Sequence, residues 1–164
     1  MSIVLPEGFG YIAVPLVSLG WVLVWQSLLV GGARKRAGIA YPQMYAEQAE
    51  CKENPAAVQF NCTQRAHQNT LEAVPIAVIG TVITGLQCPC VAAALGTGFV
   101  VGRVIYTLGY KTGSPSKRLP GGFIGSLSSL GKALRCIAPI VIQALLSGLL
   151  LGATYSALKL TSVL

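Results

Sequence analysis

Charged side chains are absent from three long stretches of this 164-residue sequence, Phe9–Ala33, Ala73–Gly102 and Cys136–Leu158. A helix needs roughly 20 mostly apolar residues to cross a membrane, because the hydrocarbon core is about 30 Å thick and a helix rises about 1.5 Å per residue. The first and third stretches therefore predict one membrane-spanning helix each.

The middle stretch is long enough for more than one span, and the segment Gly85–Cys90 interrupts it. Pro89 within this segment cannot continue an incoming helix and favours the start of a new one. The sequence lacks the alternating segments of about ten residues that are typical of a membrane β-barrel. The pattern thus predicts an all-α integral membrane protein, a four-transmembrane-helix bundle with helices at about 9–33, 60–86, 89–111 and 125–158.

Composition supports this interpretation. The chain is 53% hydrophobic and only 10% charged, with a mean hydropathy of +0.64. A soluble domain is about 25% charged, so this chain could not cover a water-exposed surface with polar groups. We expect residues 1–164 to form a single domain, and the first helix to be retained because no basic segment of a signal peptide precedes it.

The basic residues predict the orientation in the membrane. Eight of the twelve lie on one side of the predicted bundle, in the connections between the first two and the last two helices. Because cytosolic loops are enriched in Lys and Arg, we expect these connections to face the cytosol. The net charge of +7 is then explained by the topology. The sequence contains no basic stripe with interleaved aromatic residues, the pattern that would indicate nucleic-acid binding.

The cysteines indicate no metal site. There are five of them, without a Cys-x-x-Cys pair, and the single histidine cannot complete a zinc site with them. We expect free thiols and no bound metal.

Two polar stripes interrupt the apolar pattern. At 100° per residue, Arg65, Asn69 and Glu72 fall within about 60° of one another on the second helix. Arg103, Tyr106 and Tyr110 do the same on the third. Ionisable groups at membrane depth cost at least about 2.5 kcal/mol each and usually face a bundle interior or a wet cavity. The stripes therefore predict a polar pocket that opens toward the basic connections.

This pocket has two interpretations. In the simpler one, Glu72 pairs with Arg103 or Arg65 and holds helices together. In the other, a surplus of cations around one acid indicates a zwitterionic ligand with more carboxylates than amines, because arginines bind carboxylates and Glu72 would accept an ammonium. Glutathione has this chemistry, although composition does not select it over similar ligands. The surplus cations are Arg34, Arg65, Arg103, Lys117 and Arg118.

The thirteen-residue segment Phe60–Glu72 resembles the signature of the MAPEG superfamily, the membrane-associated proteins of eicosanoid and glutathione metabolism. Within the superfamily, the similarity is closest to the type 3 microsomal glutathione S-transferases and covers roughly residues 8–150. Further matching segments, in order and spacing, are Ala33–Lys35, Tyr41–Tyr45, Gly102–Tyr106, Gly109–Tyr110 and Gly113–Arg118.

The resemblance implies a site for glutathione as co-substrate, formed by Arg34, Arg65, His67, Asn69, Glu72, Arg103, Tyr106 and Tyr110. It implies that Arg118, or alternatively Lys117, stabilises the glutathione thiolate. It also implies a homotrimer with pockets between subunits, so that Arg34 could serve a neighbour's site. The expected function is glutathione conjugation to lipophilic electrophiles or reduction of lipid hydroperoxides, in the endoplasmic reticulum or another intracellular membrane, with the active site facing the cytosol. The second substrate would enter from the membrane lipid.

Two residues differ from the leukotriene C4 synthase pattern, which has a tyrosine where this chain has Ala73 and an arginine where it has Lys35. These differences disfavour leukotriene synthesis as the main role. A non-enzymatic lipid-presenting protein like 5-lipoxygenase-activating protein is the other alternative, and Asn69, Glu72 and Arg118 argue against it. A small transporter has little support, since the chain shows no inverted repeat.

Overall fold

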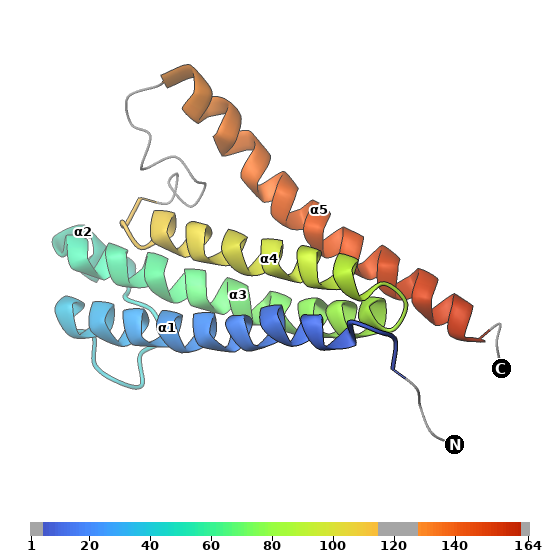
Figure 1. Cartoon of the computed structure of the whole chain (residues 1–164). Helices are drawn as coiled ribbons and strands as arrows, with labels where there is room; N and C mark the ends of the chain where they lie inside the picture. Colours follow the sequence, from blue (N-terminus) through green and yellow to red (C-terminus); the bar gives the residue numbers. More distant parts are fainter. Residues whose placement is uncertain (1–4, 115–127, 162–164) are drawn as a thin grey trace. The chain divides into compact units, whose positions relative to one another are not determined.

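The computed structural model of the chain describes residues 5–114 and 128–161, the side chains of 128–143 excepted. All regular structure in these residues is helical (Figure 1). A short 3-10 helix, η1, precedes α1, and the elements are η1 (Phe9–Ile12), α1 (Ala13–Ala37), α2 (Gln48–Glu53), α3 (Pro55–Gly85), α4 (Pro89–Tyr110) and α5 (Ser128–Thr161). The predicted all-α fold is confirmed.

Three helices in the described part of the chain are long and apolar enough to cross a membrane. They lie in Phe9–Ala37, Pro89–Tyr110 and Ala144–Thr161. The remaining long helix, α3, contains 31 residues and rises about 46 Å. Its length suffices for a span, but the polar block between Asn61 and Glu72 lowers its hydropathy. This block is the segment on which the predicted pocket depends.

Some helix ends lie beyond the predicted ranges, whereas α3 and α4 end within one residue of them. α1 continues through Arg34, Lys35 and Arg36 to Ala37, four residues beyond the predicted end. Cations in the last turn interact favourably with the helix dipole, so the apolar stretch ends before the helix does. The start predicted near residue 125 for the last helix lies outside the described residues, and α5 ends at Thr161 rather than 158.

Asn54 and Pro55 explain why α3 begins five residues before the predicted position. The side-chain oxygen of Asn54 accepts a hydrogen bond from the backbone N–H of Ala56 at 2.9 Å, and Pro55 occupies the first helical position. The Asn54 amide also donates to the carbonyl of Ala37 at 3.1 Å, which fixes the start of α3 against the end of α1. The short helix α2 between them was not predicted, because its six residues, four of them polar, give no apolar period.

The contacts of the chain divide it into two compact units, each made of parts of several helices. The first contains α1 up to Trp21, the segment Ala73–Gly102 and α5 from Ile140. Its helices approach closely at small residues. A Cβ atom added at Gly152 would lie 2.8 Å from the side chain of Thr84, whose hydroxyl donates to the carbonyl of Leu149 at 3.1 Å.

The second unit contains Val22–Glu72 and the segment from Arg103. Its apolar core is formed by buried residues of α1, α3 and the connection between α1 and α2, namely Ala33, Ala37, Ile39, Ala46, Ala57 and Phe60. The amide of Asn61 clamps this connection, because it donates to the carbonyl of Ala46 at 2.9 Å and accepts from its N–H at 2.8 Å. All the predicted binding residues that the structure describes belong to this second unit.

Candidate functional site

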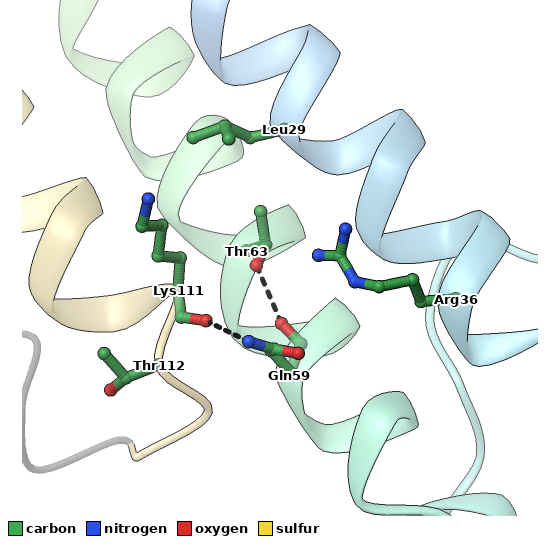
Figure 2. Close-up of a pocket in the computed structure, with 6 residues that line it drawn as sticks. All are labelled: Leu29, Arg36, Gln59, Thr63, Lys111 and Thr112. Atoms are coloured by element: carbon green, nitrogen blue, oxygen red, sulfur yellow. Dashed lines mark hydrogen bonds between the residues drawn. The ribbon is translucent and has the colours of Figure 1, made fainter.

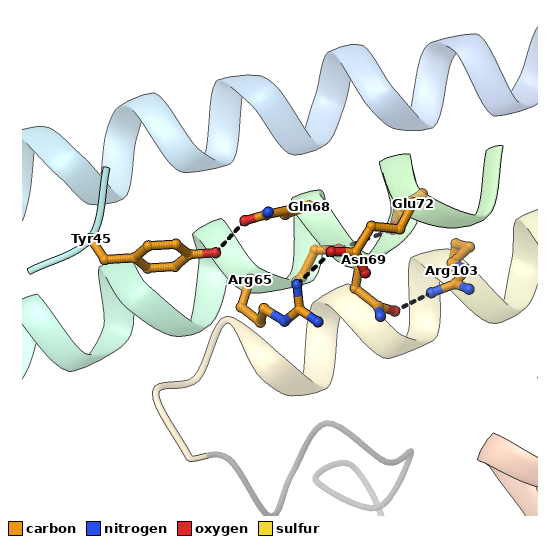
Figure 3. Close-up of polar contacts among 8 residues, drawn as sticks. Tyr45, Arg65, Gln68, Asn69, Glu72 and Arg103 are labelled. Atoms are coloured by element: carbon orange, nitrogen blue, oxygen red, sulfur yellow. Dashed lines mark hydrogen bonds and ion pairs between the residues drawn. The ribbon is translucent and has the colours of Figure 1, made fainter. Parts of the chain in front are cut away.

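Arg65 and Glu72 form an ion pair on α3, with Arg65 Nη1 2.8 Å from Glu72 Oε1 (Figure 3). They are seven residues apart, which is two helical turns, so both side chains extend along one face of the same helix. Both side chains are close to half exposed, at 44% and 49%. This pair therefore satisfies its own charges without joining two helices.

Arg103 connects α4 to α3. Its Nη1 donates to the side-chain oxygen of Asn69 at 2.7 Å, and the residue is buried (Figure 3). Asn69 lies between Arg65 and Glu72 along the same face of α3. The Arg103 guanidinium also lies 5.8 Å from the ring centroid of Tyr106. A buried cation is thus held beside the exposed ion pair.

Two tyrosines extend this face along α4. The ring centroids of Tyr106 and Tyr110 are 5.6 Å apart at an interplanar angle of 74°, an edge-to-face arrangement. Tyr110 is buried against Cys62 and Ala66 of α3. The structure therefore brings together six of the predicted residues, which we call the α3–α4 face: Arg65, Asn69, Glu72, Arg103, Tyr106 and Tyr110.

Tyr45 makes a second polar contact on α3. The hydroxyl of Tyr45, in the connection that precedes α2, donates a hydrogen bond to the side-chain oxygen of Gln68 (Figure 3). Gln68 lies within the thirteen-residue polar block, next to Asn69. Tyr45 therefore holds the connection against the polar half of α3.

His67 lies apart from the α3–α4 face. Its Nδ1 is 3.3 Å from the side-chain oxygen of Gln26 on α1. The amide nitrogen of Gln26 donates to the hydroxyls of Thr70 on α3 and Thr107 on α4, at 2.9 and 2.7 Å. Gln26, Thr70 and Thr107 are buried, and their hydrogen bonds link three helices. The role of His67 in glutathione binding stays a prediction.

Sequence reasoning missed Gln26, although a signal was present. It is the one amide side chain within the charge-free stretch 9–33, and polar side chains in such stretches usually hydrogen-bond across helices.

Arg34 is directed into the connection that follows α1. Its Nη1 donates to the carbonyls of Gln43 at 2.6 Å and Ala40 at 3.4 Å. The guanidinium also lies over the rings of Tyr41 and Phe60, with centroids 4.4 and 4.6 Å away. Within its own chain Arg34 thus organises this connection, and its role in glutathione binding stays a prediction. Arg118 and Lys117 lie outside the described residues.

Residues 12–138 match a sequence model of the MAPEG family. The chain belongs to the MAPEG family. An uncharacterized protein of the cyanobacterium Synechocystis is 30% identical over 115 residues, which are 70% of this chain and 76% of the relative.

MAPEG membership and the apolar helices indicate a multi-pass membrane protein. Membership also supports a general role of the kind found in this family, which includes membrane glutathione transferases, leukotriene C4 synthase and 5-lipoxygenase-activating protein. Glutathione is the substrate that the family generally uses, and the family also contains non-enzymes. The α3–α4 face lies entirely within the matched residues.

Proposed function

We propose that this MAPEG protein is a membrane-bound glutathione transferase, similar to the type 3 microsomal enzymes, with glutathione peroxidase activity. The observation that supports this most is the charge balance of the α3–α4 face, where two guanidinium groups accompany one carboxylate. Glutathione has two carboxylates and one ammonium near neutral pH. The net charge of the face is therefore opposite to that of the ligand, and each ligand charge has a partner of opposite sign.

Binding would replace the ion pair between Arg65 and Glu72. Arg65 would pair with a ligand carboxylate and Glu72 with the ligand ammonium, so two ion pairs form where one is lost. Arg103, held by Asn69, would support the site with its positive charge near the second carboxylate. An arginine fits this task because its planar fork of donors matches a carboxylate.

The alternative role of Glu72 as a link between helices has less support. Its partner Arg65 belongs to the same helix, and Asn69, not Glu72, makes the hydrogen bond to Arg103 on α4. A half-exposed ion pair in a membrane-embedded helix would be costly if it faced lipid. In this proposal a neighbouring subunit of a homotrimer covers it, with Arg34 near the neighbour's site.

The chemistry requires an ionised thiol. Thiols with a pKa near 8.5 are mostly protonated at neutral pH, and only the thiolate attacks electrophiles. In the proposal, Arg118 stabilises the thiolate, with Lys117 as the alternative. The thiolate attacks an electrophilic carbon, a carbon–sulfur bond forms, and the leaving group departs with its electron pair.

The same thiolate reduces a lipid hydroperoxide. Sulfur takes the terminal peroxide oxygen, the lipid alkoxide leaves and is protonated to an alcohol, and a second glutathione converts the sulfenic acid to glutathione disulfide and water. Lipophilic substrates would reach the site from the bilayer. We propose the endoplasmic reticulum membrane as the location, with the site facing the cytosol.

Turnover by the purified full-length protein tests the proposal. Glutathione should be consumed with an aryl halide and with a lipid hydroperoxide, at rates that saturate with glutathione. Saturable glutathione binding without turnover would favour a lipid-presenting protein, and a strong preference for leukotriene A4 would favour a leukotriene C4 synthase. Absence of glutathione binding would refute the assignment of the α3–α4 face.

A further inference from the structure

A cavity of about 310 Å³ lies in the second unit, away from the α3–α4 face (Figure 2). It is formed where the end of α1, the first turns of α3 and the end of α4 come together. Its lining residues are Leu29, Arg36, Gln59, Thr63, Lys111 and Thr112. None of them belongs to the proposed glutathione site.

The lining has the composition of an anion site. Arg36 and Lys111 supply two cations, Gln59 an amide, and Thr63 and Thr112 two hydroxyls, while none of the six lining residues is acidic. Neither cation forms an ion pair within the described part of the chain. Two cations at the ends of separate helices match the charge of a phosphate group. The hydroxyls of Thr63 and Thr112 donate to backbone carbonyls of their own chain and line the cavity with polar oxygen atoms.

Local hydrogen bonds fix one wall of the cavity. The amide of Gln59 donates to the carbonyl of Lys111 at 3.0 Å, and the hydroxyl of Thr63 donates to the carbonyl of Gln59 at 2.8 Å (Figure 2). Gly113 follows this contact with a φ of 81°, a left-handed conformation that favours glycine. The backbone of Lys111 is therefore held against α3 before any ligand binds.

The depth of the cavity suits a lipid headgroup. Leu29 is eight residues from the end of α1, and Thr63 is eight residues from the start of α3. At 1.5 Å per residue, both lie about 12 Å from these helix ends, and Arg36 and Lys111 lie at the ends themselves. The cations are thus at the level expected for headgroups, with an apolar side chain below them.

We propose that this cavity binds the phosphate group of an anionic phospholipid. Basic pockets between membrane helices on the cytoplasmic side commonly bind such headgroups. Long basic side chains at helix ends can also extend into water without any partner. The cavity, its polar lining and the backbone of Lys111 held by Gln59 distinguish this site from such solvated cations.

Native mass spectrometry of the detergent-purified full-length protein tests the proposal, with phosphatidylglycerol and phosphatidylcholine as probes. Wild-type protein should retain phosphatidylglycerol in preference to phosphatidylcholine. A basic residue near an anionic surface contributes about 1 kcal/mol, so Arg36→Gln and Lys111→Gln should each lower retention about five-fold. The matched control is Lys35→Gln, which removes an exposed neighbouring cation that does not line the cavity. It should retain the lipid like wild type.

Two further arms separate the alternatives. The variants Arg36→Lys and Lys111→Arg keep the positive charge and should retain most of the lipid that wild type retains. This result would show that the lost charge, rather than misfolding, lowers retention in the Gln variants. Circular dichroism checks the helicity of every variant. Equal retention in wild type and both Gln variants, or an equal decrease in Lys35→Gln, would overturn the proposal. If inorganic phosphate raised the melting temperature through Arg36 and Lys111 while phosphatidylglycerol did not, the site would bind soluble phosphate and the lipid assignment would be wrong.

Discussion

Asn69 of α3 accepts a hydrogen bond from the guanidinium of Arg103 on α4 at 2.7 Å, and the arginine is 95% buried. This hydrogen bond joins a buried cation on α4 to an amide oxygen on α3. The same asparagine lies one turn from Arg65 and from Glu72. Asn69 therefore affects both the packing of α4 on α3 and the geometry of the proposed glutathione site.

Asn69→Ala should destabilise the protein by about 1.5–3 kcal/mol, because a hydrogen bond to a buried charge is lost. Thermal unfolding in detergent, followed by circular dichroism, measures this change. Leu71→Ala is the control, since Leu71 is an exposed residue of the same helix. Equal melting temperatures for Asn69→Ala and wild type would show that Arg103 does not depend on this hydrogen bond.

Glu72→Gln should weaken glutathione binding by about ten-fold or more, because a charge-assisted hydrogen bond to the ligand ammonium is worth about 1.5–3 kcal/mol. The control is Glu53→Gln, which removes an exposed carboxylate from α2. Equilibrium dialysis with labelled glutathione measures both affinities. If the two variants bound glutathione equally well, Glu72 would serve only as the partner of Arg65.

Much of the fold follows from the sequence because membrane helices leave long charge-free stretches. The break at Pro89 was predicted from residue chemistry alone, and α4 begins at Pro89. The end of α1 and the start of α3 were not predicted, since they depend on basic residues beyond the apolar stretch and on the Asn54 cap. α2 was missed because it is held by contacts to other segments rather than by its own apolar period.

The candidate site was predictable where helical periodicity placed residues on one face. Arg65, Asn69 and Glu72 follow that rule, and so do the α4 residues Arg103 and Tyr106. The direction of Arg34 was not predictable, because carbonyls in an irregular connection determine it. The partners of Gln26 likewise depend on how three helices pack, which spacing along one helix does not reveal.

Gly152→Ala should destabilise the first unit by about 1–3 kcal/mol, because the added methyl group would lie 2.8 Å from the Thr84 side chain. The matched control is Gly31→Ala in α1, where nothing lies within 4 Å. That change should be neutral or stabilising by up to about 1 kcal/mol, since alanine favours helices. Thermal unfolding compares the two variants, and similar effects would show that α3 and α5 do not pack closely at Gly152.

Thiolate formation tests the proposed mechanism most directly. If Arg118 stabilises the thiolate, Arg118→Ala should raise the pKa of bound glutathione and leave its affinity nearly unchanged, because most binding contacts involve the carboxylates and the ammonium. The loss should appear in kcat, as expected for an interaction made mainly with developing charge, and removing one strong donor typically costs about 100-fold.

The pH dependence gives the sign of this effect. A raised thiol pKa means that less thiolate is present at neutral pH, so the rate of Arg118→Ala should rise toward that of wild type as the pH increases. Ultraviolet absorbance of the bound thiolate, titrated in wild type, Arg118→Ala and Lys117→Ala, provides the direct measurement. Loss of the thiolate only in the Lys117 variant would assign activation to Lys117, and retention in both variants would move it to another cation, with Arg34 and Lys35 the next to test.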